Sequence, residues 1–389
     1  MRWILVLCLA LTAASPRVSA TLGGSDVPEP APLRPRAISF VDRSTGFVLV
    51  RSLDPNIAVQ LLRTDNGGDS WATVGDLDMN VQAIAFVSRH LGWATGLRCL
   101  VPLAAELCFS ILWRTTDGGQ SWARSLEHTI TRRLDGEDGV LLPQFADPAH
   151  GWTLVGTDHC VRETVSGSSL GCDRRLLATD DGGVNWTARY QGDLRLDRVR
   201  FVDALRGWAT TSGVAGGAPR VGYTGDGGRT WDVRLAGGTA YDLAAMDAAL
   251  AYVLEYRPMS CLPRCGASID LLRTTDAGAH WTVMQDAREH DDGIWWPLDT
   301  RPNPGERITG LTAGSTKTVA VTSNRGQWAY DVDTVIVSHD GGMTWSRAPR
   351  SGPEHPTAVW LADDRTGFAL GGPPKTESHY VWRTRDGGA

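Results

Sequence analysis

Short apolar strands separated by glycine-rich and polar turns are the dominant pattern along this chain. Residues 38–42 (ISFVD) alternate apolar and polar side chains, a polar turn follows, and residues 46–50 (GFVLV) resume with a glycine and an aromatic residue. Alternation with a period of two is typical of half-buried β-strands, so each such pair predicts two antiparallel strands. The pair returns at residues 84–93, 145–152, 199–208 and 359–368, with weaker copies near Met246 and Leu311.

A second repeat, the box, places an aspartate between a Ser or Thr and two small residues and ends in tryptophan. Its second copy, residues 115–122, reads TTDGGQSW. Neighbouring copies are 45 to 64 residues apart, which suits one four-stranded propeller blade with variable loops. The aspartate position of the seven copies is filled by Asn66, Asp117, Asp181, Asp226, Asp276, Asp340 and Asp386.

The two repeats together predict an all-β fold, a seven-bladed β-propeller of four-stranded antiparallel blades. The apolar segment before each box predicts a third strand, the residues after the tryptophan predict a fourth, and the box forms the c–d turn between them. We expect one propeller domain over residues 37–389, preceded by a proline-rich segment over residues 21–36. The last blade lacks its fourth strand and is incomplete. Because proline removes ladder donors, residues 21–36 make a poor closing strand, and truncation of the last blade is favoured.

The residue types of the box favour a structural role over a catalytic one. Glycines adopt the positive φ angles of tight turns, and a short Asp or Asn side chain accepts hydrogen bonds from turn amides. The tryptophan supplies a large buried area between neighbouring blades. Calcium binding by the box carboxylates is the alternative, although Asn66 suits hydrogen bonding better than metal ligation.

The first twenty residues have the features of an export signal. Arg2 precedes an apolar run over residues 3–14, which is too short to cross a bilayer core of about 30 Å as a helix. Residues 18–20 (VSA) fit a cleavage site, so we expect a signal peptide over residues 1–20 and a mature chain that starts at Thr21. The protein is then secreted, periplasmic or at the cell surface, and an uncleaved signal anchor is the alternative.

Six cysteines remain once Cys8 is removed with the signal. An even number of cysteines in an exported chain favours disulfides over metal ligands. A zinc site at residues 261–265 is the alternative, but the sequence places no partner ligands nearby, and we expect no metal. We predict local bridges that each join two strands of one blade, namely Cys99 with Cys108, Cys160 with Cys172, and Cys261 with Cys265.

The charge balance argues against nucleic acid as a partner. The formal net charge is −6 at pH 7 and the isoelectric point is about 5.9, whereas nucleic-acid-binding proteins usually carry a basic surplus. Lys317 and Lys375 are the only lysines, and this preference for arginine is typical of a GC-rich, bacterial genome. The sequence contains no nucleotide, haem or flavin motif, so we expect no cofactor. No segment after the signal is long and apolar enough to span a membrane.

The longest insertions map to the face of the predicted propeller that lies opposite the boxes. Residues 127–140 contain two adjacent arginines, and residues 286–301 contain a histidine, paired carboxylates and adjacent tryptophans. Long loops on a rigid scaffold commonly carry binding sites, and these side chains suit a sugar or a peptide. A solvated loop with its tryptophans packed on the propeller is the alternative. The candidate binding residues are His290, Asp291, Asp292, Trp295, Trp296, Arg132 and Arg133.

The box resembles the Asp box of the BNR repeat in the sialidase-like superfamily. Residues 114–122 (RTTDGGQSW), taken with residues 92–96 (GWATG), are similar to the photosystem II stability/assembly factor-like propellers and their relatives in non-photosynthetic bacteria. The resemblance covers residues 37–388. It implies a non-enzymatic assembly or binding scaffold, but it does not imply photosynthesis, because functions diverge within a fold family.

The sequence therefore predicts an exported, non-enzymatic propeller that binds an unidentified protein or carbohydrate partner. Pure adhesion or envelope structure without a ligand pocket is a variant of this hypothesis. The alternative is a glycoside hydrolase of the exo-sialidase type with a central pocket, which requires three arginines, a Tyr/Glu pair and an acid Asp. Tyr330 and Glu306 are present, but no spacing ties them together.

Overall fold

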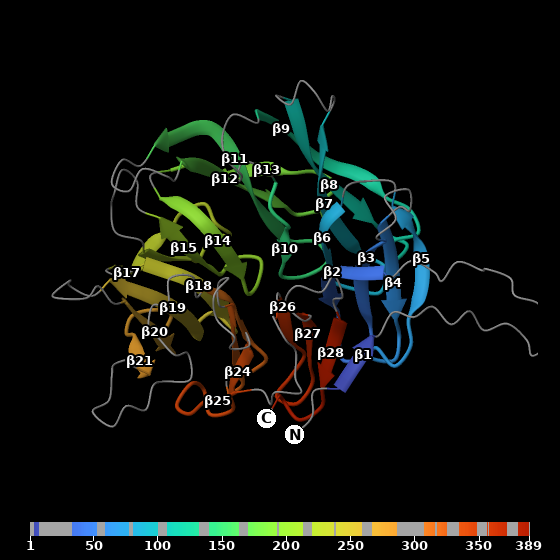
Figure 1. The fold of residues 1–389 in the computed structure, drawn as a ribbon. Helices are drawn as coiled ribbons and strands as arrows, with labels where there is room; N and C mark the ends of the chain where they lie inside the picture. Colours follow the sequence, from blue (N-terminus) through green and yellow to red (C-terminus); the bar gives the residue numbers. More distant parts are fainter. Residues whose placement is uncertain are drawn as a thin grey trace, which may run out of the picture.

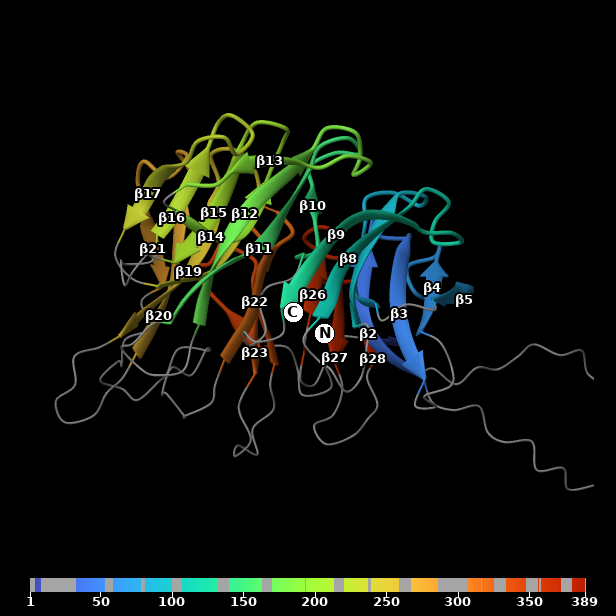
Figure 2. The same cartoon turned by 90° about the horizontal axis from the view of Figure 1, so that it is seen from above.

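The computed structural model arranges the chain as a ring of seven four-stranded antiparallel sheets, which confirms the predicted propeller (Figure 1). Each sheet is one blade, and first strands of neighbouring blades contact one another at six of the seven joints, including the joint between blades 7 and 1. The turns that join the strands of the blades gather at the upper rim in Figure 2. The structure describes residues 4–7, 33–52, 59–77, 81–99, 107–131, 140–162, 170–192, 194–212, 220–236, 239–258, 267–285, 307–315, 317–324, 334–347, 356, 358–371 and 380–388.

Six blades take their strands in chain order. Blade 1 consists of β2 (Leu33–Phe40), β3 (Gly46–Ser52), β4 (Val59–Thr64) and β5 (Ala72–Leu77). Blade 2 consists of β6 (Val81–Phe86), β7 (Gly92–Cys99), β8 (Leu107–Thr115) and β9 (Ala123–Thr131). Blade 3 consists of β10 (Gln144–Phe145), β11 (Gly151–Arg162), β12 (Leu170–Thr179) and β13 (Thr187–Tyr190). Blade 4 consists of β14 (Arg195–Phe201), β15 (Gly207–Ser212), β16 (Arg220–Thr224) and β17 (Asp232–Ala236). Blade 5 consists of β18 (Thr239–Ala245), β19 (Ala251–Pro258), β20 (Ala267–Thr274) and β21 (Thr282–Gln285). Blade 6 consists of β22 (Arg307–Ala313), β23 (Val319–Asn324), β24 (Thr334–Ser338) and β25 (Ser346–Arg347).

The core lies between neighbouring blades, where aromatic rings stack across the joints. Phe47 of blade 1 stacks on Phe86 of blade 2 with ring centroids 3.6 Å apart, and the box residue Trp122 meets Phe86 edge-on at 6.1 Å. Blades 7 and 1 repeat the stack through Phe368 and Phe40 at 3.5 Å. Offset and edge-on ring pairs of this kind stabilise a core beyond the area that they bury. The joint that closes the ring therefore packs like the joint between blades 1 and 2.

The glycine that opens the second strand of a blade is required by this packing. A Cβ atom on Gly92 would lie 2.4 Å from the ring of Phe86, and one on Gly46 would lie 2.3 Å from the ring of Phe40. Any larger residue would displace the aromatic ring from the joint. The glycine-aromatic pairs of the sequence thus mark the sites where one strand passes under the ring of its neighbour.

The last blade is completed from the other end of the chain. Its sheet has the order β1-β28-β27-β26, in which β26 (Ala358–Leu361), β27 (Gly367–Gly371) and β28 (Tyr380–Thr384) follow the usual path. The fourth position is filled by β1 (Ile4–Leu7), which pairs antiparallel with β28 (Figure 1). The C-terminal part of the chain thus supplies three strands, as predicted, but the blade is not left incomplete, because a segment assigned to the signal peptide occupies its outer edge.

The first blade begins earlier than the proline content of residues 21–36 suggests. Pro35 lies within β2, opposite Val50 of β3. Because β2 is the first strand of its sheet, only one of its edges pairs with a neighbouring strand. Proline is tolerated at such an edge position, where its missing N–H is not needed by the ladder.

Candidate binding site

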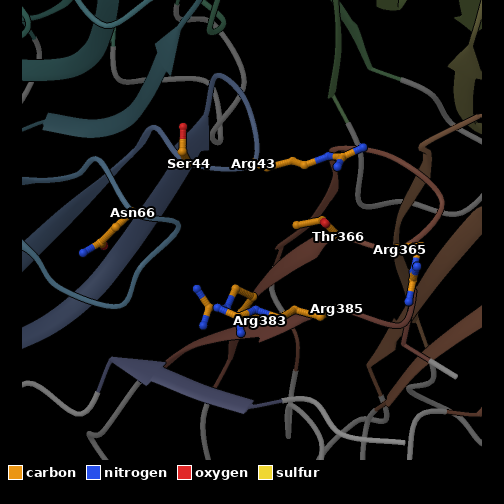
Figure 3. Close-up of a pocket in the computed structure, with 7 residues that line it drawn as sticks. All are labelled: Arg43, Ser44, Asn66, Arg365, Thr366, Arg383 and Arg385. Atoms are coloured by element: carbon orange, nitrogen blue, oxygen red, sulfur yellow. The ribbon is translucent and has the colours of Figure 1, made fainter.

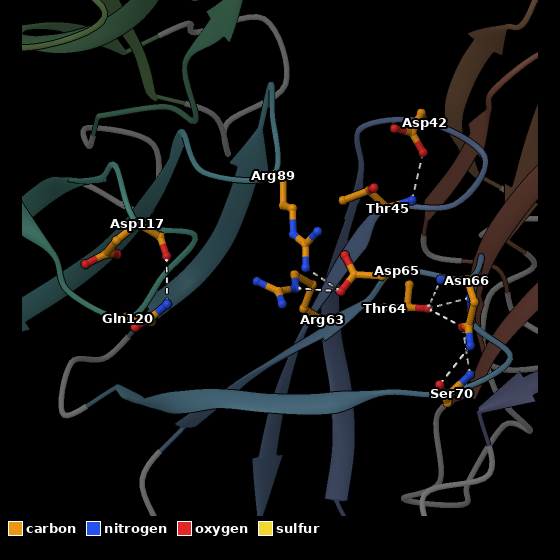
Figure 4. A network of polar contacts seen from close by, with 11 residues as sticks. Asp42, Thr45, Arg63, Thr64, Asp65, Asn66, Ser70, Arg89, Asp117 and Gln120 are labelled. Carbon is orange, nitrogen blue, oxygen red and sulfur yellow. Dashed lines mark hydrogen bonds and ion pairs between the residues drawn. The ribbon is translucent and has the colours of Figure 1, made fainter.

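The boxes are turns that satisfy their own polar groups. The hydroxyl of the first box residue donates to the carboxylate or carboxamide two positions later over 2.6 to 2.9 Å in all seven boxes. The same hydroxyl accepts a hydrogen bond from the amide four positions later, as Gly119 shows at 2.8 Å to Thr115. The carboxylate in turn accepts from the amide of the penultimate box residue, and Figure 4 shows the first box, where Asn66 plays this part. These contacts leave the boxes without a free acid or base.

Hydrogen bonding also fixes the charge of the box carboxylates. For Asp117 burial alone would raise the pKa, but bonds from the hydroxyl and amide of Ser121 and from Thr115 outweigh it and lower the pKa to about 2. The amide of Asn185 and the hydroxyl of Thr179 lower the pKa of Asp181 to about 2. A carboxylate with such a pKa stays ionised at neutral pH and cannot act as a general acid.

The structure places a basic pocket at the joint between blades 7 and 1, on the face that carries the boxes. It has a volume of about 440 Å³. Four arginines and no carboxylate belong to its lining (Figure 3). The lining residues are Arg43, Ser44, Asn66, Arg365, Thr366, Arg383 and Arg385.

Arg383 is the structural member of this pocket. It lies at the end of β28, its side chain is 6% exposed, and it pairs with Asp69. One guanidinium nitrogen donates to the carbonyl oxygen of Gly67 over 2.6 Å and another donates to Asp69 over 2.5 Å. The hydrogen bond from Arg383 holds the pKa of Asp69 below its usual value. Arg383 therefore ties the last blade to the box of the first.

The other three arginines present their charge to solvent. Arg43 is 72% exposed and pairs with Asp363, and Arg385 is 61% exposed and lies 3.5 Å from Asp69. Burial alone would raise the pKa of Asp363, but bonds from the amides of Arg365 and Thr366 and the charge of Arg43 outweigh it and lower the pKa. Four guanidinium groups thus face two ionised aspartates, so the site has an excess positive charge suited to a carboxylate or another anion.

Sequence reasoning missed this pocket because its members meet only when the ring closes. Arg43 and Arg365 occupy the a–b turns of blades 1 and 7, and Arg385 lies in the last box. The turn sequences 42–46 (DRSTG) and 363–367 (DDRTG) do carry a signal, since both place an arginine shortly before the glycine. Their proximity follows from the closed ring and from no local pattern.

The residues that the sequence singled out for binding lie outside the described part of the chain. This holds for His290, Asp291, Asp292, Trp295 and Trp296 and for Arg132 and Arg133. Their role in binding stays a prediction. Among the described residues, no group of three or more His, Cys, Asp or Glu residues gathers as metal ligands would, and no helix is long and apolar enough to cross a membrane.

Two of the three predicted cysteine pairs lie opposite one another in their sheets. Cys99 pairs with Cys108 in the β7–β8 ladder, and Cys160 pairs with Cys172 in the β11–β12 ladder. Directly opposed residues of antiparallel strands have Cα atoms about 4.5–5.5 Å apart, within the range that a disulfide spans. The bridges themselves stay a prediction, and the third pair, Cys261 with Cys265, lies outside the described residues.

These features define the molecule as an Asp-box β-propeller with a basic pocket where its ring closes. A model of the BNR/Asp-box repeat matches residues 336–347, which cover the sixth box. Among curated proteins, the photosystem II assembly lipoprotein Ycf48 of Synechococcus sp. (strain CC9902) is 26% identical over 340 aligned residues, which cover 73% of this chain and 96% of that protein. These findings agree with the resemblance drawn from the repeats.

Solved structures show the same fold at low sequence identity. A structure of YCF48 bound to a D1 peptide matches with a TM-score of 0.54 and 16% identity, covering 92% of this chain and 93% of that one. The GH74 xyloglucanase of Xanthomonas campestris matches with a TM-score of 0.56 and 14% identity, and this chain spans 52% of its length. At such identities the likeness shows the fold and carries no assignment of activity.

Proposed function

We propose that this chain is an exported, non-enzymatic propeller that binds a protein partner and holds an anionic group of that partner in the basic pocket between blades 7 and 1. The observation that carries the proposal is the gathering of four arginines around a cavity whose lining contains no carboxylate. Guanidinium groups recognise carboxylates through paired hydrogen bonds, so an acidic peptide side chain or a C-terminal carboxylate fits this site.

The similar proteins support a peptide as the ligand. The curated relative is described as an assembly lipoprotein, and the solved YCF48 structure contains a D1 peptide. A pre-formed site binds an extended peptide at a lower entropic cost, and the arginines of this pocket are already gathered in the structure. The predicted signal over residues 1–20 and the even number of cysteines after it support export.

The described pocket does not support glycoside hydrolysis. Sialidase-type chemistry places arginines beside a Tyr/Glu pair and an acid Asp. The pocket contains arginines, but neither a tyrosine nor a glutamate belongs to its lining. The glycoside hydrolases among the structural neighbours share the fold alone. The prediction of a carbohydrate partner rests on segment 286–301, which lies outside the described residues, and not on the pocket.

Anisotropy titration of a labelled peptide tests the proposal. The probe is a fluorescein-labelled twelve-residue peptide of Gly, Ser and Glu with a free C-terminal carboxylate, and its Gln counterpart with an amidated end is the neutral reference. We expect saturable binding of the acidic peptide, weakened by raising NaCl from 50 to 300 mM, because exposed charges are screened over about 8–10 Å. Arg365→Glu should raise its Kd about tenfold, the equivalent of ~1.4 kcal/mol.

Blade 2 supplies a matched control for charge reversal. Arg89 holds the same a–b turn position as Arg43 and reaches Asp65 of the preceding blade over 3.0 Å, as Figure 4 shows. Arg89→Glu should therefore leave the affinity unchanged, whereas Arg43→Glu should weaken it. Equal loss in both variants, or equal binding of the acidic and neutral peptides, would contradict the assignment of the pocket.

A further inference from the structure

One box departs from the other six at its charged position. Asn66 stands where the remaining boxes carry Asp117, Asp181, Asp226, Asp276, Asp340 and Asp386. All seven positions are described, and Asn66 is the one among them that belongs to the lining of the basic pocket, together with Arg383 and Arg385 (Figure 3). The single carboxamide of the repeat therefore falls on the box that lines the cluster of arginines.

The turn of a box closes with either residue type. The side-chain oxygen of Asn66 accepts hydrogen bonds from the Thr64 hydroxyl and from the Ser70 amide, each over 2.9 Å (Figure 4). Asp117 accepts the equivalent two bonds in the second box over 2.8 and 2.9 Å. The third bond is reversed, since Asn66 donates to the Ser70 hydroxyl over 2.8 Å, and Asp117 instead accepts from the Ser121 hydroxyl over 2.5 Å. Because a serine hydroxyl both donates and accepts, hydrogen bonding does not require an asparagine at this turn.

The residue at this position does decide the charge of the turn. Hydrogen bonds from the amide and the ring of His280 lower the pKa of Asp276 to about 2, and three other box aspartates have a pKa of about 2 as well. An aspartate in a box is therefore ionised at neutral pH. At position 66 it would add a carboxylate to a site whose four guanidinium groups face Asp69 and Asp363, and it would reduce the excess of positive charge from two to one.

We propose that Asn66 is a specificity-determining residue of the basic pocket, which keeps the box of blade 1 uncharged so that the arginines attract an anionic group. The carboxamide supplies the hydrogen bonds of the turn, and the missing carboxylate leaves the excess positive charge to the ligand. The inference rests on the proposed function for the ligand, an acidic peptide. The effect of Asn66 on the charge of the pocket applies to any small oxyanion, so inorganic phosphate tests it separately.

Asn66→Asp in the full-length chain tests this role with two probes. One probe is the labelled acidic peptide, followed by anisotropy, and the other is radiolabelled inorganic phosphate, followed by equilibrium dialysis at constant ionic strength. At low salt the Kd of each probe should rise about threefold to tenfold, because the added unit charge lies within a Debye length of the bound anion. The difference between the two proteins should shrink as NaCl is raised to about 300 mM, where screening is stronger.

Two variants separate charge from structure. Asp117→Asn makes the opposite exchange in a box that does not line the pocket, and it should leave both Kd values unchanged. Asn66→Asp combined with Asp69→Asn restores the number of carboxylates at the pocket, and it should bring the affinity back to within about twofold of the original chain. Asn66→Asp itself should unfold at the same urea concentration as the original chain or a higher one, since it restores the residue of the other boxes.

The two probes also separate this inference from the proposed function. If the peptide bound the original chain and Asn66→Asp equally well, the role of Asn66 would be wrong and the peptide site would stand. If phosphate binding were weakened by Asn66→Asp and the peptide bound neither protein, the role of Asn66 would stand and the peptide site would be wrong. Failure of both probes to bind the original chain, or a loss of affinity accompanied by a lower urea midpoint, would overturn the role of Asn66.

Discussion

Truncation of Arg383 to alanine tests how the ring is held closed. This side chain crosses from blade 7 to blade 1 and donates to the Gly67 carbonyl over 2.6 Å and to Asp69 over 2.5 Å. The joint between blades 2 and 3 has a related link, in which Arg114 donates to the Gly182 carbonyl over 2.7 Å. Blades 2 and 3 follow one another along the chain, whereas β26, β27 and β28 of blade 7 meet blade 1 through side-chain and backbone contacts, so the same contact should matter more at the closing joint.

The expected cost follows from the two contacts. A hydrogen bond from a charged donor contributes about 1.5–3 kcal/mol, and the pair with Asp69, whose side chain is 53% exposed, is screened to about 0.5–1 kcal/mol. Arg383→Ala should then lower the free energy of unfolding by about 2–4 kcal/mol. With an unfolding entropy of about 2.1 cal/mol/K per residue, a propeller of this size should lose roughly 2.5–5 °C in Tm.

Calorimetry and urea unfolding of Arg383→Ala and Arg114→Ala measure this difference directly. Arg114→Ala removes the one carbonyl contact, so its cost should lie near 2 kcal/mol or below. Asp69→Asn should cost less than Arg383→Ala, because the bond to Gly67 remains. If Arg114→Ala destabilised the protein as much as Arg383→Ala, or if Arg383→Ala left Tm unchanged, the closing role assigned to Arg383 would be wrong.

Three further predictions concern the boxes and the blade joints. Because its folded pKa of about 2 lies below the usual aspartate pKa of 3.8, Asp117 contributes stability above pH ~4 that is lost as the pH falls towards 2. Asp117→Asn, which copies Asn66, should therefore flatten the decrease in urea midpoint between pH 5 and pH 2.5. Ala277 has a φ of 59° where other boxes have glycine, so Ala277→Gly should raise stability by about 0.5–1 kcal/mol, whereas Gly118→Ala should lower it in the same thermal assay. The side-chain amide of Gln144 donates to the backbone carbonyl of Phe201 in the next blade and accepts from its backbone N–H. Gln144→Ala should therefore lower the free energy of unfolding in urea by about 1–3 kcal/mol, while Gln144→Glu should retain only the hydrogen bond from the Phe201 amide.

The propeller could be predicted because its determinants are local and repeated. A box contains the hydroxyl, the carboxylate and the glycines of its own turn, as the bonds between Thr115, Asp117 and Gly119 illustrate. The glycine-aromatic pair likewise predicts where two blades pack, since the ring of Phe86 leaves no room for a side chain at Gly92. In blades 5 and 6 the second repeat is weak because aliphatic side chains such as Leu254 fill the joint in place of stacked rings.

The basic pocket and the closing strand could not be predicted in this way. Residues 43 and 383 are far apart in sequence, and only the closed ring brings them to one joint. The closing strand was missed for a different reason. Residues 3–14 have the composition of a signal peptide, and an apolar run of this length is equally compatible with an outer strand. Composition alone does not separate a segment that is removed from one that pairs with a sheet edge.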